Sequence, residues 1–248
     1  MSKQAKVASI RPLAEGVFEW RLRMVDPPAV TFRPGQYVSL DCGVDAHGLP
    51  QRRAYSIASP PTEPHGLTLC AKLISGGVGS RYLGELEEGD AVDFTGPMGM
   101  FVLELLHPGD VVFAATGTGV APFLPMLHEA LAREERGDVL LFWGLRSQAD
   151  LFYVDELERL AAANPRLTAH VTLSRPKGHW AGERGRITPK LLEALPLMRD
   201  PVFYLAGNGA MIEELRRALL DRGVPRRRVH TEAFFEAAAP PAPAAPPA

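Results

Sequence analysis

The fold of this chain is decided by Ala114-Ala115-Thr116-Gly117-Thr118-Gly119-Val120-Ala121-Pro122-Phe123. These residues end an apolar run of strand length, residues 110–116, and a pattern of helical spacing follows at residues 122–135. Glycine lets the backbone approach a ligand closely, and proline suits the first turn of a helix. The third glycine of the dinucleotide fingerprint Gly-x-Gly-x-x-Gly is absent, with Pro122 near its place, so only the strand–turn–helix context favours ligand binding here.

Strands and helices alternate on the C-terminal side of this turn. Apolar runs predict further strands at residues 139–143, 167–173, 202–206 and 229–235. Helical spacing predicts helices at residues 151–163, 189–195 and 211–220. This alternation is typical of a parallel sheet covered on both faces.

The N-terminal side of the turn has a different pattern. Phe18, Trp20, Leu22 and Met24 alternate with charged or polar residues, as in a half-buried strand. Further short strands are predicted at residues 37–40, 53–58, 67–73 and 91–94, with one helix at residues 80–86. Many short strands separated by glycine and proline turns indicate a small antiparallel barrel.

The sequence thus predicts a β-barrel plus an α/β domain, with a ligand in the crevice between them. We expect the barrel at residues 1–105 and the α/β domain at residues 106–236, with a boundary in residues 103–109. Residues 237–248 are alanine and proline only, so we expect a disordered tail, either an inert extension or a spacer or docking tail.

The composition excludes several classes of protein. The 248 residues carry 27 Lys+Arg and 29 Asp+Glu, without the basic excess of a duplex-binding protein. Only Cys42 and Cys70 occur, which excludes a disulfide framework, a Cys-ligated iron–sulfur cluster and a zinc ribbon. No histidine spacing signals a zinc helix, so no metal site is expected. No signal peptide or apolar span is visible, and we expect a cytoplasmic protein without membrane contact.

Two motifs in the barrel half carry chemistry. In Arg53-Ala54-Tyr55-Ser56, the arginine suits a phosphate, and a tyrosine two residues along a strand faces the same side. The alternative is a surface strand with an unpaired arginine. In Ser75-Gly76-Gly77-Val78-Gly79-Ser80, glycines open a short helix that Ser80 would cap, and free N–H groups at a helix start bind anions. The alternative is a plain loop with a capping serine.

Arginines follow two of the predicted parallel strands. Arg146 comes directly after one strand and Arg175 after the next, and Arg184 and Arg186 follow within one loop. An acid at such a place would bind a ribose 2′-hydroxyl, whereas arginine suits a 2′-phosphate. These residues therefore favour NADP over NAD, with a solvated basic loop as the alternative. The stretch Gly207-Asn208-Gly209 adds a further glycine break between a strand and a helix.

In this order, the motifs resemble the ferredoxin–NADP reductase superfamily, specifically its bacterial stand-alone FAD-dependent ferredoxin (flavodoxin)–NADP reductases. The resemblance covers residues 5–236. It implies an antiparallel FAD-binding barrel followed by a parallel-sheet NADP-binding domain, in agreement with the pattern above.

The resemblance also implies residue roles. It assigns FAD contacts to Arg53, Ala54, Tyr55, Ser56, Ala71, Lys72, Leu73, Val78, Gly79, Ser80, Thr118 and Phe235. It assigns NADP contacts to Gly117, Gly119, Arg146, Ser174, Arg175, Arg186, Gly207, Asn208 and Met211. Catalytic roles fall to Ser56, Thr118 and Glu232, although a surface carboxylate is the alternative for Glu232. A core phenylalanine is the alternative for Phe235. Ala206 stands where many relatives have a cysteine near the nicotinamide, so no thiol is expected there.

The implied reaction needs little acid–base chemistry from the protein, because the cofactors perform the redox step. NADPH would pass a hydride to FAD, and single electrons would go to a ferredoxin or flavodoxin. Two cysteines cannot hold an iron–sulfur cluster, so this carrier is a separate protein, and we expect the reductase to be a monomer. Arg52, Lys72 and Arg81 could steer an acidic carrier, or could be ordinary solvated cations. The alternatives are an NADH-dependent reductase component of an oxygenase, a free-flavin reductase, or an electron-transfer subunit that never binds nicotinamide.

Overall fold

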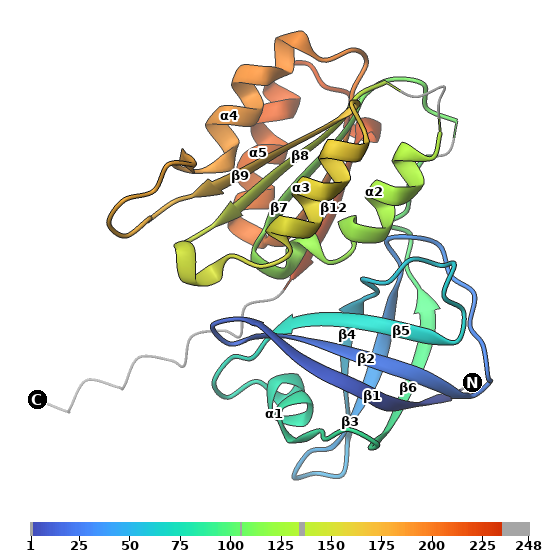
Figure 1. Cartoon of the computed structure of the whole chain (residues 1–248). Coiled ribbons are helices and arrows are strands. Elements are labelled where there is room, and N and C mark those ends of the chain that lie inside the picture. Colours follow the sequence, from blue (N-terminus) through green and yellow to red (C-terminus); the bar gives the residue numbers. More distant parts are fainter. Residues whose placement is uncertain (1, 105, 134–136, 235–248) are drawn as a thin grey trace, which may run out of the picture.

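Two six-stranded sheets make up the protein (Figure 1). The computed structural model describes residues 2–104, 106–133 and 137–234. The antiparallel sheet precedes the parallel sheet in the chain, and the prediction of a barrel followed by an α/β fold is confirmed. The predicted Ala/Pro tail and Phe235 lie outside the described residues.

The first sheet is antiparallel throughout, with strand order β4-β3-β6-β1-β2-β5. Its strands are β1 Lys3–Ala14, β2 Val17–Asp26, β3 Tyr37–Val44, β4 Pro50–Ser56, β5 Gly66–Lys72 and β6 Ala91–Met98. A bridge between Ile57 and Leu69 joins the chain after β4 to β5, so the sheet curls towards a barrel. The interior contains the alternating residues of β2, among them Trp20, Leu22 and Met24.

The second sheet is parallel, with strand order β10-β9-β8-β7-β11-β12. Its strands are β7 Val111–Thr116, β8 Val139–Leu145, β9 Leu167–Leu173, β10 Glu183–Arg184, β11 Val202–Asn208 and β12 Val229–Phe234. The strand order reverses direction beside β7, and in such sheets ligands bind outside the carboxyl ends of the strands at that point.

Four helices cover both faces of the parallel sheet. They are α2 Phe123–Leu131, α3 Val154–Ala163, α4 Ile187–Ala194 and α5 Gly209–Asp221. The helices α2 and α3 share a buried cluster with Val111, Phe113 and Ala115 of β7, whereas α4 and α5 pack with Val112 and Ala114. Successive residues of β7 thus face opposite layers, which explains the continuous apolar run in the sequence.

Several element limits differ from those predicted. The helix α1 spans Val78–Glu85 and starts after Gly77, and the prediction that Ser80 caps it is wrong. Ser80 lies inside the helix, and its Oγ accepts a hydrogen bond from the Ile74 nitrogen at 2.9 Å, which closes the preceding loop. The helix α3 starts later than predicted because Tyr153 adopts a left-handed backbone conformation (φ 55°). The strands β1 and β10 were not predicted, because their sequences are rich in polar residues.

The two halves of the molecule are in direct contact. Val17, Ala58 and Cys70 from the antiparallel half belong to the same buried cluster as Phe123 of α2. Figure 1 shows the carboxyl ends of β7 and β12 turned towards the barrel, so the ligand edge of the parallel sheet faces the other half. Across the described ranges, no helix has both the length and the hydropathy needed to cross a bilayer.

Candidate functional site

The motif on β4 presents a cation and an aromatic ring on one face. Arg53 is exposed and donates hydrogen bonds to the Arg52 carbonyl at 2.7 Å and to Gln51 at 3.4 Å. Within the ranges given above, it forms no ion pair with a carboxylate. A Cβ atom on Gly79 would lie 2.2 Å from the Tyr55 hydroxyl and 3.0 Å from Cγ of Arg53. The bare backbone of Gly79 therefore lets α1 pack directly against both side chains.

An open cavity of about 450 Å³ lies at the start of α1, the helix that packs against this face through Gly79. It is lined by the loop between β5 and α1 together with two residues of the first helical turn: Leu73, Ile74, Ser75, Gly76, Gly77, Ser80 and Arg81. Arg81 is exposed, and the first backbone N–H groups of α1 lie at this place. The cavity therefore combines a glycine-lined wall, a guanidinium group and a helix N-terminus.

These residues fit the FAD group that the resemblance implies. A pyrophosphate needs cations and free donors, which Arg53 and the start of α1 supply. A flavin ring needs a flat apolar wall, and the Tyr55 ring is half-buried at the right strand. Burial raises the pKa of Tyr55 above its usual value, so its hydroxyl stays neutral.

The second part of the site joins the two halves of the molecule. The Ser56 hydroxyl donates a hydrogen bond to Oε1 of Glu232 at 2.6 Å, although 176 positions separate them in the sequence. Ser56 is buried, and Glu232 lies near the end of β12. Burial raises the pKa of Glu232, and the hydrogen bond from Ser56 only partly offsets this effect. The arrangement is a carboxyl group that retains its proton at higher pH than a solvated one.

The Gly-Thr-Gly turn after β7 forms a 3-10 turn, Gly117–Val120, that packs against β11. A Cβ on Gly119 would lie 2.4 Å from the Ala206 carbonyl oxygen, so this glycine is required by packing. Gly207 (φ 116°) is required in the same way, since its Cβ would lie 2.6 Å from the Thr116 carbonyl oxygen. Gly117 (φ 54°) faces open space instead, and its carbonyl accepts a hydrogen bond from Trp143. Of the three, Gly117 is the one left open to a ligand.

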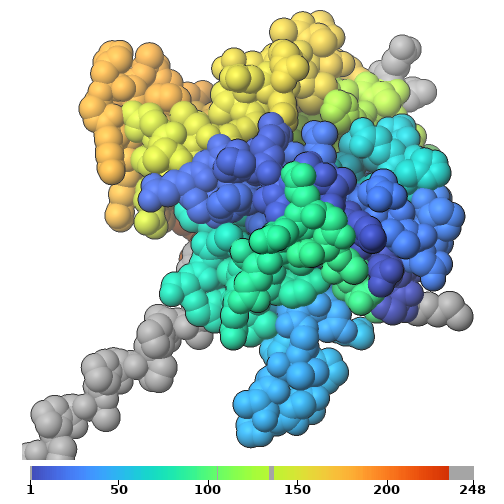
Figure 2. All heavy atoms as spheres, turned by 60° about the horizontal axis from the view of Figure 1, so that its bottom comes forward, coloured from blue at the N-terminus to red at the C-terminus, as the bar shows by residue number. Residues whose placement is uncertain are grey.

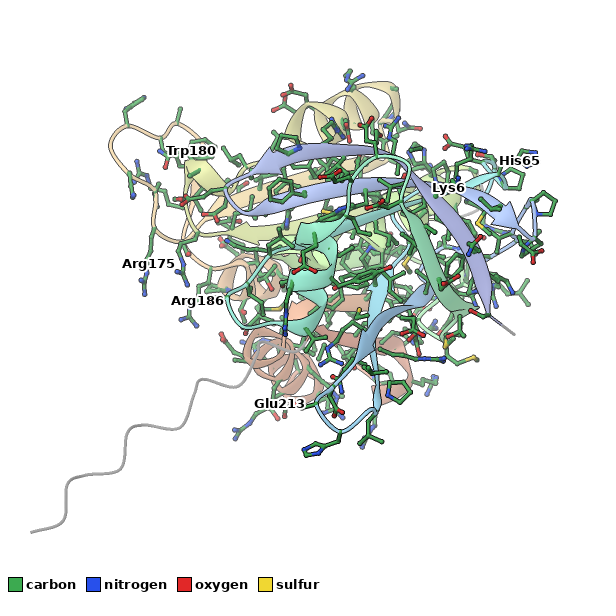
Figure 3. The ribbon with its side chains drawn as sticks, turned by 90° about the horizontal axis from the view of Figure 1, so that it is seen from below. Lys6, His65, Arg175, Trp180, Arg186 and Glu213 are labelled. Carbon is green, nitrogen blue, oxygen red and sulfur yellow. The ribbon has the colours of Figure 1, made fainter. Side chains whose placement is uncertain are left out.

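Two arginines meet at the carboxyl ends of neighbouring strands. The Arg175 nitrogen donates to the Arg146 carbonyl at 2.7 Å, which places both residues directly after β8 and β9. Arg186 precedes α4, and its guanidinium group lies 3.5 Å from the Glu214 carboxylate. Figure 3 shows Arg175 and Arg186 pointing into solvent on the same side of the molecule. The hydroxyl of Ser174 donates to the Leu145 carbonyl at 3.2 Å, so it supports the strand ends.

Other predicted site residues have structural partners. The Asn208 side chain accepts hydrogen bonds from the nitrogens of Ala210 and Met211, and thereby caps α5. Among the predicted steering residues, Lys72 is paired with Asp150 at 3.4 Å, whereas Arg52 and Arg81 are exposed on the barrel. Lys72 thus ties β5 to the α/β half.

Sequence reasoning missed a buried contact between the halves. The hydroxyl of Tyr153 donates to Glu19 Oε2 at 2.6 Å, and Glu19 is only 4% exposed. No sequence signal identifies either residue, because Glu19 reads as the solvent face of an alternating strand. The structure shows that this face of β2 is covered by the segment before α3.

Comparison with known proteins identifies the two halves separately. Residues 4–103 match the model of an oxidoreductase FAD-binding domain, and residues 113–217 match that of an oxidoreductase NAD-binding domain. The chain is 35% identical over 238 residues to ferredoxin–NADP reductase B of Sorangium cellulosum, covering 93% of this chain and 97% of that protein. It is 28% identical to the ferredoxin–NAD(P)(+) reductase component of the Pseudomonas putida naphthalene 1,2-dioxygenase system, covering 92% of this chain and 68% of that protein.

Solved structures agree with this similarity. The Amycolatopsis cytochrome P450 reductase GcoB is 31% identical with a TM-score of 0.84, over 94% of this chain and 70% of that one. A ferredoxin–NADP(+) reductase of Neisseria gonorrhoeae with bound FAD and NADP has a TM-score of 0.80, over 94% of this chain and 99% of that one. At 23% identity, the latter supports the fold alone. The chain spans 63% of the reductase component of a Rhodococcus jostii propane 2-monooxygenase, so some relatives are considerably longer.

Proposed function

Because the chain belongs to the ferredoxin–NADP reductase family, and is an FAD- and NAD(P)-binding oxidoreductase, we propose that it exchanges electrons between NADP(H) and a separate one-electron carrier protein, a ferredoxin or flavodoxin. The observation that supports the choice of NADP(H) is the backbone hydrogen bond that sets Arg146 and Arg175, both exposed, side by side at the carboxyl ends of β8 and β9. Guanidinium groups at that edge suit a 2′-phosphate, which NAD lacks.

The barrel residues hold the flavin cofactor. When bound, FAD accepts a hydride and passes on single electrons. Arg53, Val78, Gly79 and Ser80 face its phosphates, and Tyr55 forms the wall against its ring system. Ala71 of β5 and Leu73, the first residue after β5, would flank the same site, with Lys72 held towards the α/β half by Asp150.

The reacting atoms lie where the halves meet. Ser56 would lie beside the flavin, and Glu232 holds it through the 2.6 Å hydrogen bond. Partial burial raises the pKa of Glu232 above its usual value, and the hydrogen bond from Ser56 partly offsets this. Thr118 and Gly117 face the crevice from the other half and orient the nicotinamide. The protein would thus exclude water and hold the Ser56–Glu232 pair next to the transfer site.

The dinucleotide lies along the carboxyl edge of the parallel sheet. Arg146, Arg175 and Arg186 would hold the 2′-phosphate, and Arg186 would have to leave Glu214, which lies 3.5 Å away, in order to do so. Gly207, Asn208 and Met211 border the nicotinamide end at the start of α5.

A separate electron carrier is supported by the two cysteines of this sequence, which are fewer than the four thiolates that ferredoxin-type clusters use. The exposed Arg52 and Arg81 attract an acidic carrier to the flavin half. From the sequence, we also propose that the protein is cytoplasmic and monomeric.

A second candidate is the reductase component of an oxygenase. It is favoured by the similarity to GcoB and to the naphthalene dioxygenase component. In that case the oxygenase or its ferredoxin would receive the electrons, and the nicotinamide would be NADH or NADPH.

Absorbance spectra of the purified protein, followed by anaerobic titration with NADPH and with NADH, test the proposal. We expect a yellow protein whose flavin is reduced at lower NADPH than NADH concentrations, and which then reduces an added ferredoxin or flavodoxin. A strong preference for NADH would favour the oxygenase component. A colourless protein that takes up no FAD would overturn both candidates.

A further inference from the structure

An ion cluster around the buried Glu19 connects the two halves through residues other than Ser56 and Glu232. Glu19 of β2 accepts hydrogen bonds from Arg11 of β1, at 3.2 Å from Nε and 3.0 Å from Nη2. It also accepts the 2.6 Å hydrogen bond from the Tyr153 hydroxyl. The Arg11 guanidinium carbon lies 5.9 Å from the centroid of the Tyr153 ring. We call Arg11, Glu19 and Tyr153 the interdomain clamp.

The charges of the clamp are matched. Burial acts to raise the pKa of Glu19, but the hydrogen bonds from Arg11 and Tyr153 outweigh it, and the net pKa is lowered. Burial raises the pKa of Tyr153, so its hydroxyl stays protonated and donates. Arg21 adds a further contact to the same carboxylate at 3.3 Å. The carboxylate is thus ionised and satisfied, and the loss of one donor would leave a buried charge short of a partner.

The clamp holds one end of a segment that begins at a proposed NADP contact. Residues 146–153 connect β8 to α3, with Arg146 at one end and Tyr153 at the other. The left-handed conformation of Tyr153 is uncommon for a residue with a side chain, and it persists only where surrounding contacts impose it.

The same segment contacts the barrel at two intermediate points. The Ala149 carbonyl accepts a hydrogen bond from the Glu15 nitrogen at 3.3 Å, and Asp150 pairs with Lys72 at 3.4 Å. Asp150 also accepts hydrogen bonds from the nitrogen and the hydroxyl of Ser147, the residue after Arg146. Figure 2 shows the N-terminal strands, in dark blue, directly against the yellow-green residues of this region. Contacts with the barrel therefore extend along the segment almost to Arg146.

We propose that the interdomain clamp is a positioning device for hydride transfer: Tyr153, held by Glu19 and Arg11, sets the distance and angle between the flavin half and the nucleotide half. The inference rests on the proposed function. Hydride transfer depends steeply on geometry, and a displacement of about 1 Å can cost on the order of 100-fold in rate. None of the three clamp residues is among the proposed FAD or NADP contacts, so the clamp would act on the rate through the segment that it holds.

The test compares Tyr153→Phe with the wild-type holoenzyme. This change removes one hydroxyl and keeps the ring. At saturating NADPH we expect the rate of flavin reduction to fall about tenfold or more, because the reacting atoms lose their alignment. We expect the FAD content to be unchanged and the Kd for NADP⁺ to change less than about twofold, since the binding residues are intact. The primary isotope effect with NADPH deuterated at the transferred position should change, which a loss of stability alone would not cause.

Two further variants serve as controls. Glu156→Gln removes the exposed second partner of Arg11, which lies 3.6 Å away, and should leave the rate of flavin reduction at the wild-type value. Arg11→Gln acts on the same carboxylate from the protein surface, and should reproduce the Tyr153→Phe effect in weaker form. If Tyr153→Phe does not fold, Arg11→Gln replaces it as the test variant.

Amide hydrogen exchange of the FAD-loaded proteins gives a readout that requires no turnover. Exchange in residues 146–153 should rise at least several-fold in Tyr153→Phe and stay unchanged in Glu156→Gln. Unchanged exchange in Tyr153→Phe would overturn the clamp, whether or not the wild-type protein oxidises NADPH. A wild-type protein that does not oxidise NADPH would count against the proposed function instead. Faster exchange with an unchanged rate of flavin reduction and an unchanged isotope effect would overturn the positioning role.

Discussion

Replacing Arg175 by alanine is expected to weaken the binding of NADPH far more than that of NADH. Arg175 is exposed and follows β9, next to Arg146. In the described part of the chain, its guanidinium group is not engaged by a carboxylate, whereas Arg186 is held by Glu214. Arg175 can therefore bind a 2′-phosphate without first breaking an ion pair.

The magnitude follows from the loss of one charged hydrogen bond, about 1.5–3 kcal/mol. Since each 1.4 kcal/mol is a factor of ten, the Kd for NADPH should rise roughly 10- to 150-fold. The lower end of this range applies at high salt, because the site is open to solvent and screening weakens the contact. For NADH, which has no 2′-phosphate, the change should be less than about twofold.

Stopped-flow reduction of the flavin over a range of NADPH and NADH concentrations measures both effects. Arg222→Ala is the matched control, because Arg222 is an exposed arginine at the C-terminus of α5, at the opposite edge of the sheet. Equal losses for the two nucleotides in Arg175→Ala, or a similar loss in Arg222→Ala, would refute the assignment of Arg175 to the phosphate.

Three further outcomes are expected. Gly79→Ala should lower the FAD content, measured as the ratio of flavin to protein absorbance, because the new Cβ would lie 2.2 Å from the Tyr55 hydroxyl; full FAD content would contradict the proposed packing. Glu214→Gln should lower the KM for NADPH by up to about fivefold, since it frees Arg186 from an exposed ion pair worth about 0.2–1 kcal/mol; an unchanged or higher KM would count against that role. The rate of flavin reduction should fall as the pH rises through the raised pKa of Glu232, because its carboxyl then ionises. Glu232→Gln cannot ionise and should give a flat pH profile. A pH profile in this variant identical to that of the wild type would exclude Glu232 as the titrating group.

The fold was largely predictable because its signals are local. The alternation of Trp20, Leu22 and Met24 predicts a strand with one buried face, and these residues lie in the barrel core. The apolar run of β7 predicts a strand buried on both faces, and its residues face two separate helical layers. Strand and helix signals of this kind depend on neighbours a few positions apart, so they are readable without a structure.

Element limits were less predictable where a tertiary contact overrides a local preference. Ser80 has the preferred side chain for a helix cap, yet the helix begins earlier because its hydroxyl is used by the Ile74 nitrogen. Residues 151–153 continue the helical spacing of α3, yet Tyr153 is held outside the helix by Glu19.

The sequence by itself determined the two fold classes, their order, and the glycine and arginine motifs at the predicted strand ends, because each depends on residues close together in the chain. Only the tertiary structure decided which distant residues meet: the Ser56 hydroxyl with Glu232, and Glu19 with Tyr153. It also distinguished Gly117, which is open to a ligand, from Gly119, which is required by packing. The physical reason is that a buried polar contact depends on how two independently formed units pack, and neither unit carries a local pattern that names its partner in the other.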